Sequence, residues 1–275
     1  MYHAHYARPT PDPRLEITTL RHEGPLPPGW LAPGFVVNLV VDGEADLFAR
    51  GAVHRVGPGS VVLADAGEFR RVSKRVTHGA DTRSLTCEST LLASAIAERT
   101  TRPTVAHFRH SISDDPRLAQ AVRALYSTID SRAPSLVVES AVERFFDAVS
   151  RNLQLTPSGY RSDHPAIRRV REMIDDRAIE DLTLVELSKE ASLSRAHLIR
   201  AFTREVGVTP HQYLLHARIT RARALLANGA SPARAAVATG FCDQSHLTRY
   251  FTRVMGVGPA AYRRAVIQPR ATRRG

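Results

Sequence analysis

Cysteine is scarce in this 275-residue chain, and long apolar runs are absent from it. The two cysteines, Cys87 and Cys242, lie in different halves, so the sequence offers neither a disulfide framework nor a Cys-x-x-Cys metal pair. No stretch approaches the roughly eighteen apolar residues of a membrane-spanning helix. The first residues contain histidine and proline where a signal peptide needs an apolar run. We therefore expect a cytoplasmic protein with reduced thiols and no membrane partner.

Motifs of catalysis and metal binding are missing as well. The sequence contains no GxSxG elbow, no Walker loop and no Rossmann fingerprint. A metal site of the His-x-His type also needs a carboxylate and a later histidine at the right spacing, which this chain does not supply. Its candidate histidines are His3, His5, His54 and His78. We predict that the chain has no catalytic residues, no metal and no cofactor, and that it is not an enzyme.

Positive charge is abundant and unevenly distributed. The net charge is +11; residues up to Ser162 carry 19 Lys and Arg against 17 Asp and Glu, and the remaining residues carry 19 against 10. Such an excess in roughly a hundred residues suits a polyanion, because each Lys or Arg placed on a phosphate releases condensed counterions. The charge favours a nucleic-acid partner for the C-terminal part, although charge alone leaves RNA or a membrane surface open.

A duplicated unit occupies the C-terminal part. Residues Ser194–Tyr213 match residues Asp243–Tyr262 at ten of twenty positions, with an offset of 49. In each copy, large apolar residues recur at i, i+4 and i+8, which predicts an amphipathic helix with one buried face. These residues are Leu198, Phe202 and Val206, then Leu247, Phe251 and Met255. Gly207 and Gly256 follow where a left-handed helix cap is expected.

A shorter helix is predicted before each of these helices. Thr183 and Glu186 form a capping box at the first, and Ser231-Pro232 begins the second. A long helix over about Thr209–Asn228 joins the two copies. Two helix-turn-helix units held by one stiff helix can place two recognition helices in successive major grooves, about 34 Å apart. The sequence therefore predicts an all-α domain that binds duplex DNA over residues 166–265.

The stretch GFCDQSHLTRYFTRVMGVGPAAYR, at residues 240–263, is the most specific part of the sequence. It resembles the signature of the AraC/XylS transcription regulators, and the resemblance extends from about Ala166 to Arg264. The resemblance implies two units that bind promoter or operator DNA, an effector-sensing domain at the N-terminal end, and RNA polymerase as a further candidate partner.

Positions that differ between the copies on the groove-facing side are candidates for base reading, because the shared positions build the scaffold. At the positions that match the AraC/XylS family, the resemblance implies seven base contacts: Ala196, Ile199, Arg200, Gln244, Ser245, His246 and Arg249. Arg200 and Arg249 suit guanine and Gln244 suits adenine, but a phosphate contact or a structural role is the alternative for the arginines and His246, which recur in both copies. Expected phosphate contacts are Thr203, Arg204, Thr252 and Arg253.

The N-terminal part has the pattern of short strands. From Leu31 to about Ser84, β-branched runs alternate with Gly, Pro and Asp turns, including an expected hairpin turn at Val41–Glu44. The segment Val56–Leu63 resembles the turn and strand of a cupin-type barrel, as found in sensing domains of the same family. Effector contacts stay unknown: Trp30 and Phe35 are the nearest large aromatics, and a buried aromatic is more often core than pocket.

The predicted fold class is α+β, with a cupin-like β-barrel and trailing helices followed by an all-α domain with two helix-turn-helix units joined by a long helix. The predicted parts are a sensing and dimerisation domain at 1–155 (barrel about 15–110, helices about 115–154), a linker at 156–165, the DNA-binding domain at 166–265 and a basic disordered tail at 266–275. The resemblance implies that the helices at 115–154 pair two subunits into a homodimer; the alternative is that they pack on their own barrel.

These features predict a one-component, sequence-specific transcription regulator that binds double-stranded DNA and responds to a small-molecule effector of unknown identity. An effector shifts a conformational or dimer equilibrium only if its affinity differs between the two states. Three alternatives remain: a cupin-type metal enzyme carrying a DNA-binding tail, a nonspecific architectural DNA-binding protein, and a protein-interaction adaptor.

Overall fold

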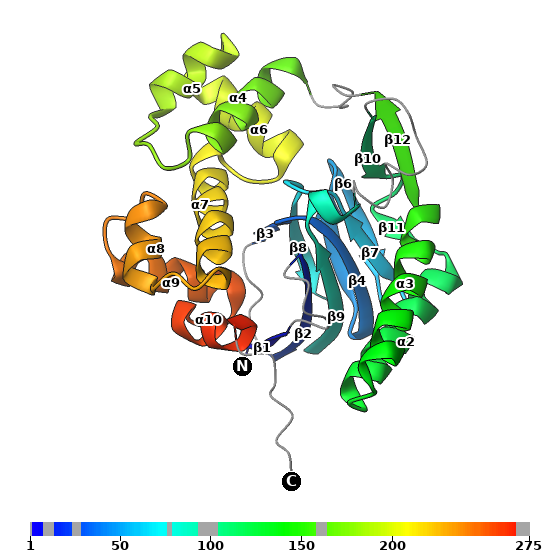
Figure 1. The fold of residues 1–275 in the computed structure, drawn as a ribbon. Coiled ribbons are helices and arrows are strands. Elements are labelled where there is room, and N and C mark those ends of the chain that lie inside the picture. Colours follow the sequence, from blue (N-terminus) through cyan, green and yellow to red (C-terminus); the bar gives the residue numbers. More distant parts are fainter. Residues whose placement is uncertain are drawn as a thin grey trace.

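The computed structural model describes residues 2–7, 14–23, 29–75, 79–92, 104–157 and 164–267. Strands build its N-terminal half and helices its C-terminal half, which confirms the predicted α+β class (Figure 1). His78, most of the expected linker and nearly all of the expected basic tail lie outside the described residues. Of the helices described, none has the length and apolar character needed to cross a membrane.

Two antiparallel sheets form the N-terminal half. The six-stranded sheet has the order β1-β2-β9-β4-β7-β11, and the four-stranded sheet has the order β3-β8-β5-β6. The strands are β1 Tyr2–Ala7, β2 Leu15–Glu23, β3 Trp30–Leu31, β4 Phe35–Asp42, β5 Ala45–Ala49, β6 Ala52–Val56, β7 Val61–Ala64, β8 Phe69–Arg75, β9 Gly79–Cys87 and β11 Ile112–Ser113. β10 (Thr104–Phe108) and β12 (Leu153–Pro157) form a separate pair. In the described ranges no strand ladder joins the two larger sheets, so the cupin-like fold is a pair of facing sheets and not a closed barrel.

The prediction of a hairpin turn at Val41–Glu44 is wrong. β4 pairs with β7 and β9, whereas β5 pairs with β6 and β8, so this segment carries the chain from one sheet to the other. Gly43 permits the crossing because its φ is +89° and a Cβ there would lie 2.3 Å from the carbonyl oxygen of Gly79. The tight hairpin instead joins β5 to β6 through Arg50 and Gly51, both with positive φ.

Helices α2 (Pro116–Asp130) and α3 (Ser135–Arg151) cover the outer face of the six-stranded sheet (Figure 1). Asp115 accepts the N–H of Arg117 and caps α2, whose first residue is Pro116. The core between sheet and helices includes Leu15, Leu39, Leu63, Leu85, Leu118, Val122, Leu125 and Phe145. The helices thus pack on their own sheet through their buried apolar residues.

The C-terminal half consists of seven helices in the described part of the chain. They are α4 Pro165–Asp176, α5 Leu184–Ala191, α6 Arg195–Val206, α7 Pro210–Ala227, α8 Pro232–Ala238, α9 Gln244–Met255 and α10 Pro259–Ile267. The capping boxes at Thr183 and Thr209 are both formed. Gly207 (φ 93°) and Gly256 (φ 74°) end α6 and α9 in the left-handed conformation. The predicted arrangement of two helix-turn-helix units is confirmed.

α7 lies between these units and beside the sheets (Figure 1). Leu214 belongs to the core of the first unit, and Ile219 and Leu226 belong to that of the second. On another side, the ring of His216 packs edge-on against Phe69 of β8, with 5.0 Å between ring centroids. The helix is therefore buried by three neighbours and has no simple apolar stripe in its sequence.

Candidate nucleic-acid interface and effector cavity

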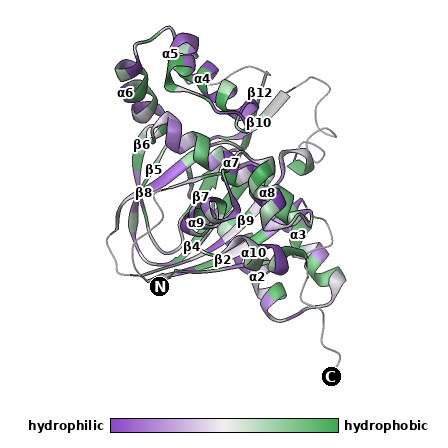
Figure 2. Ribbon diagram, turned by 90° about the vertical axis from the view of Figure 1, so that its left-hand side faces the viewer, coloured by the Kyte–Doolittle hydropathy of each residue, from purple (hydrophilic) through white to green (hydrophobic). Residues whose placement is uncertain are grey.

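α9 has the form expected of a recognition helix. Asp243 precedes it in an extended conformation, and its carboxylate accepts the N–H of His246 at 2.7 Å, which caps the helix. Leu247 and Phe251 are fully buried and hold α9 against α7 and α8. In Figure 2, which looks onto the side that carries α6 and α9, hydrophilic and hydrophobic segments alternate along the helices, as expected for helices with one buried face.

α6 repeats this construction in the first unit. Ser194 caps it by accepting the N–H of His197 at 3.3 Å, and Leu198 and Phe202 are fully buried. The turn before α6 is tight because Ser192 adopts a left-handed conformation with φ 54°. Both recognition helices therefore begin at a capping side chain and end at a glycine, so local chemistry sets their length and the face that stays exposed.

The structure places most of the predicted base-contacting residues at the surface. Ala196 and Arg200 on α6, and Gln244, Ser245 and Arg249 on α9, are exposed; Ile199 and His246 are half-buried. The ring of His246 contacts the rings of Phe241 and Tyr250 edge-on, with centroids 5.4 and 5.0 Å away.

The predicted phosphate-contacting residues differ more from one another in their exposure. Arg204, Thr252 and Arg253 are exposed. Thr203 is half-buried, and its hydroxyl oxygen is covered without a hydrogen-bond partner among the described residues. A phosphate would reach the Thr203 hydroxyl only after a local movement, whereas its equivalent Thr252 is already open.

Part of the positive charge of this half is structural. Arg218 donates hydrogen bonds to the carbonyl oxygens of Ala178 (2.7 Å), Glu180 (2.8 Å) and Gly240 (2.7 Å), which ties the first unit to the turn of the second. Arg171 donates to the carbonyl oxygen of Gly67 in the N-terminal half at 2.8 Å. The charge excess read from the sequence therefore overstates the number of arginines available to DNA.

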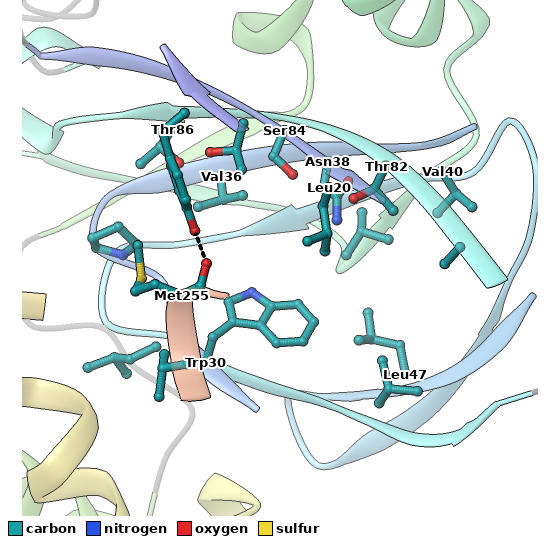
Figure 3. A pocket seen from close by; sticks show the side chains of 18 of the residues that line it. Leu20, Trp30, Val36, Asn38, Val40, Leu47, Thr82, Ser84, Thr86 and Met255 are labelled. Atoms are coloured by element: carbon teal, nitrogen blue, oxygen red, sulfur yellow. Dashed lines mark hydrogen bonds between the residues drawn. The ribbon is translucent and has the colours of Figure 1, made fainter. Parts of the chain in front are cut away.

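A cavity of about 190 Å³ lies between the two sheets. The six-stranded sheet contributes polar residues that include Asn38, Thr82, Ser84 and Thr86, and Trp30 and Leu47 of the four-stranded sheet lie opposite (Figure 3). Val56 and Val72 of the four-stranded sheet also line the cavity. Asn38 Oδ1 and Thr82 Oγ1 are buried without a hydrogen-bond partner in the described residues. Because buried polar atoms are normally hydrogen-bonded, these two atoms offer open sites to a ligand. An apolar cavity with a few such groups has the composition of a small-molecule site.

The DNA-binding half closes the cavity. Its lining includes Ile219, Thr220 and Arg223 of α7 together with Val254 and Met255, the last residues of α9. Tyr6 of β1 also lines the cavity and donates a hydrogen bond from its hydroxyl to the carbonyl oxygen of Met255 at 2.7 Å. Figure 3 draws a dashed line for this bond at Met255. A molecule in this cavity would touch the end of the second recognition helix directly.

A buried ion pair joins the halves beside the cavity. Glu16 of β2 binds Arg223 of α7, and Tyr262 of α10 donates to the second Glu16 oxygen at 2.7 Å. Burial by itself would lower the pKa of Arg223, but the Glu16 carboxylate more than offsets this and the pKa is raised. Burial also raises the pKa of the Tyr262 hydroxyl, which stays protonated as a donor. The Arg223 guanidinium is therefore charged at neutral pH.

His216 gives the junction a defined pH dependence. Burial, with the positive charge of Arg253 as a smaller cause, lowers the pKa of His216 to about 4. The unfolded chain, with an ordinary histidine pKa, then binds more protons than the folded chain between about pH 6.5 and 4, so the stabilising neutral form is lost as the pH falls. We expect the free energy of unfolding to fall by about 2 kcal/mol between pH 7 and pH 5 because of this histidine. Urea denaturation at both pH values should show it, and His216→Phe should lack that component.

His197 is the matched control, because it is an exposed histidine on α6. His197→Gln is expected to keep the pH dependence of the wild type. If the free energy of unfolding changes equally with pH in the wild type and in His216→Phe, His216 is not held neutral by its surroundings.

The comparisons with known proteins agree with both halves. Residues 187–265 match the helix-turn-helix domain, and residues 26–146 match the AraC-like ligand binding domain. The chain is 25% identical over 238 residues to YbfI, an uncharacterized HTH-type transcriptional regulator of Bacillus subtilis (strain 168), covering 85% of this chain and 86% of YbfI. It is 26% identical over 155 residues to LumQ, a probable transcriptional regulator of Photobacterium leiognathi, covering 54% and 60%.

A solved structure shares the fold over nearly the whole length. ToxT from Vibrio cholerae strain SCE256, in a structure bound to an unsaturated fatty acid, aligns with a TM-score of 0.50 at 13% identity and covers 96% of this chain and 95% of ToxT. The fold and the sites thus define a transcription regulator with a ligand-binding domain and a double helix-turn-helix DNA-binding domain. The chain belongs to the AraC family.

The sequence did not assign the cavity or the inter-domain pair. Trp30 lines the cavity, whereas Phe35 lies in the core on the other face of the sheet. One local signal was available: Thr82, Ser84 and Thr86 are polar at every second position of β9, which places them on one face of a strand. No comparable signal links Glu16 to Arg223, because they are 207 positions apart. In the described residues, no group of three or more His, Cys, Asp or Glu could hold a metal ion.

Proposed function

We propose that the cavity between the sheets is the effector site and that its occupancy controls how the two helix-turn-helix units are presented to DNA. The observation that carries this proposal is that one cavity is lined by both halves, including the end of α9. A ligand there contacts the sensing sheets and the recognition helix together, so its affinity must depend on how the two halves sit. That dependence is what a ligand needs in order to shift a conformational equilibrium.

We propose further that α6 and α9 read bases through Ala196, Ile199, Arg200, Gln244, Ser245, His246 and Arg249. The exposed Arg200, Gln244 and Arg249 are supported by their chemistry as well, because they can pair with guanine or adenine edges. Arg204, Thr252 and Arg253 are proposed phosphate contacts, and Thr203 would join them only after its hydroxyl is uncovered.

Two more partners complete the proposal. A homodimer is supported by Leu136 and Val137 of α3, which are 74% and 42% exposed although both are large and apolar. RNA polymerase is proposed as a partner because the chain is a transcription regulator. We also propose a cytoplasmic location, where a bacterial-type transcription regulator meets its DNA.

Selection of binding sites from a random duplex library, with the purified full-length chain, tests the DNA-binding part. We expect a motif that spans two adjacent major grooves. Arg249→Ala should relax the base preference at one position, at a cost of about 1–3 kcal/mol, and leave the salt dependence nearly unchanged. Affinity measurements over a salt series with the selected and mutated sites provide the readout.

Arg253→Ala is the matched control on the same helix, because both arginines are exposed. It should weaken binding to all sequences about equally and reduce the salt slope by about one. If Arg249→Ala lowers the affinity for all sequences equally, Arg249 contacts phosphates and not bases. If no motif is enriched with or without added ligands, sequence-specific regulation is refuted.

A further inference from the structure

Arg70 of β8 is a cation enclosed within the sensing half. Its side chain is 0% exposed, and all three of its guanidinium nitrogens are buried without a hydrogen-bond partner in the described residues. Burial lowers the pKa of Arg70 to about 10, so the group is still charged at neutral pH. Buried donors of a charged group that lack hydrogen-bond acceptors are unfavourable, and a charged group held in such surroundings beside a cavity is a candidate for a functional site.

The carboxylates near Arg70 are engaged elsewhere. Arg50 binds Asp65 at 2.9 Å and Glu68 at 3.0 Å. The other Asp65 oxygen accepts the N–H of Phe108 at 2.7 Å. Glu68 Oε1 is buried and, like the Arg70 guanidinium, has no hydrogen-bond partner among the described residues. These two carboxylates act on Arg70 through space but are held by Arg50, so the enclosed guanidinium has open donors.

Arg70 lies on the side of β8 that faces the cavity. It is the cross-strand partner of Trp30, and cross-strand partners project from the same face of a sheet. Val72, two residues along β8, lines the cavity. The Arg70 guanidinium carbon lies 5.5 Å from the centroid of the Trp30 ring, and of these two residues only Trp30 lines the cavity. The Trp30 ring therefore lies between Arg70 and the cavity.

We propose that Arg70 is the binding residue for a carboxylate on an otherwise apolar effector, and that the carboxylate reaches it by displacing the Trp30 ring. Guanidinium and carboxylate form paired, charge-assisted hydrogen bonds, which the open donors of Arg70 are suited to make. The wall of Leu47, Val56 and Val72 fits an apolar body, and the open oxygens of Asn38 and Thr82 supply neighbouring polar contacts. The inference rests on the cavity being the effector site, and it adds the chemical class of the effector.

Trp30 is the single tryptophan of the chain, so its fluorescence reports on this place alone. The full-length protein is titrated with octanoate and 4-phenylbutyrate, and with the corresponding alcohols, at constant ionic strength. We expect saturable changes in Trp30 emission, with each carboxylate binding at least about tenfold more tightly than its alcohol. Arg70→Met should remove that preference. Arg71→Met is the matched control: Arg71 is the next residue of β8, its guanidinium lies over the Phe48 ring, and its loss should leave the preference intact.

Thermal unfolding gives a second, independent readout. Without ligand, Arg70→Met is expected to raise the melting temperature by a few degrees, because an apolar side chain of similar size replaces a buried charge whose donors have no hydrogen-bond acceptors. Octanoate should raise the melting temperature of the wild type but not that of the variant. A lower melting temperature for Arg70→Met without ligand would show that the guanidinium already has a partner in the protein, which overturns the inference.

The inference also fails if an alcohol binds as tightly as its carboxylate, or if neither carboxylate gives a saturable change. Site selection on DNA separates this failure from that of the proposed function. If a motif that spans two grooves is recovered while the carboxylates do not bind, the proposed effector class is wrong, but the proposed function as a DNA-binding regulator is not affected. If carboxylates bind through Arg70 but do not alter DNA affinity, the control of DNA binding by this cavity is wrong.

Discussion

Replacing Glu16 with alanine is expected to lower the free energy of unfolding by about 3–5 kcal/mol, because the buried Arg223 guanidinium loses its counter-ion. The side chains of Glu16 and Arg223 are only 9% and 12% exposed, and Tyr262 donates to the same carboxylate. Since the pair joins the two halves, its loss should also uncouple them. Urea denaturation followed by Trp30 fluorescence and by helical circular dichroism should give coincident transitions in the wild type and separate ones in the variant.

Two variants control this experiment. Arg21, also on β2, is 70% exposed and pairs with Asp81 at 3.2 Å, so Arg21→Ala should cost little. Glu16→Leu combined with Arg223→Met removes both charges and should recover most of the lost stability. If Glu16→Ala costs no more than Arg21→Ala, the inter-domain pair does not hold the halves together.

Phe251→Ala is expected to destabilise the second helix-turn-helix unit by about 3–5 kcal/mol and to shorten the DNA footprint to one major groove. Phe251 is fully buried, and its ring packs against Tyr262 with 5.6 Å between centroids. Because specific binding exceeds nonspecific binding by several orders of magnitude, losing one of two units should weaken affinity about a hundredfold or more. Footprinting and titration on the selected site measure both effects.

Phe202 is the equivalent residue of the first unit and makes the comparison internal to the chain. It is also fully buried, with its ring 5.6 Å from that of Tyr213. Phe202→Ala should remove the other half of the footprint, so the two variants should protect complementary grooves. Identical footprints from both variants would contradict the assignment of one recognition helix to each groove.

The DNA-binding half was predictable because its signals are local. A capping box at Thr183 or Thr209 satisfies backbone N–H groups within one helical turn, and Gly207 and Gly256 adopt conformations that disfavour other residues. The repeat added a second copy of the same pattern. α7 was predicted to join the two units, but its packing on β8 through His216 was not, because a helix buried by three neighbours carries no distinct periodic pattern.

The fold class of the N-terminal half could be predicted from the sequence, but the connections between its strands could not. Strands and turns followed from alternating residues, yet the crossing at Gly43 reads like a hairpin turn in the sequence. Whether two strands pair or separate at such a turn depends on which partners the rest of the sheet offers. In the same way, nothing around Arg70 or Trp30 in the sequence indicates that the first is enclosed and the second lines a cavity.

The sequence by itself determined the fold class, the duplicated helix-turn-helix units, the helix ends and the exposed face that carries Arg200, Gln244 and Arg249. These features depend on interactions within a few residues or on a pattern that repeats along one helix. Only the tertiary structure decided the cavity, the inter-domain pair of Glu16 and Arg223, and which arginines are internal. Those features join residues that lie far apart in the chain, and their burial and charge balance exist only once the two sheets and α7 have packed together.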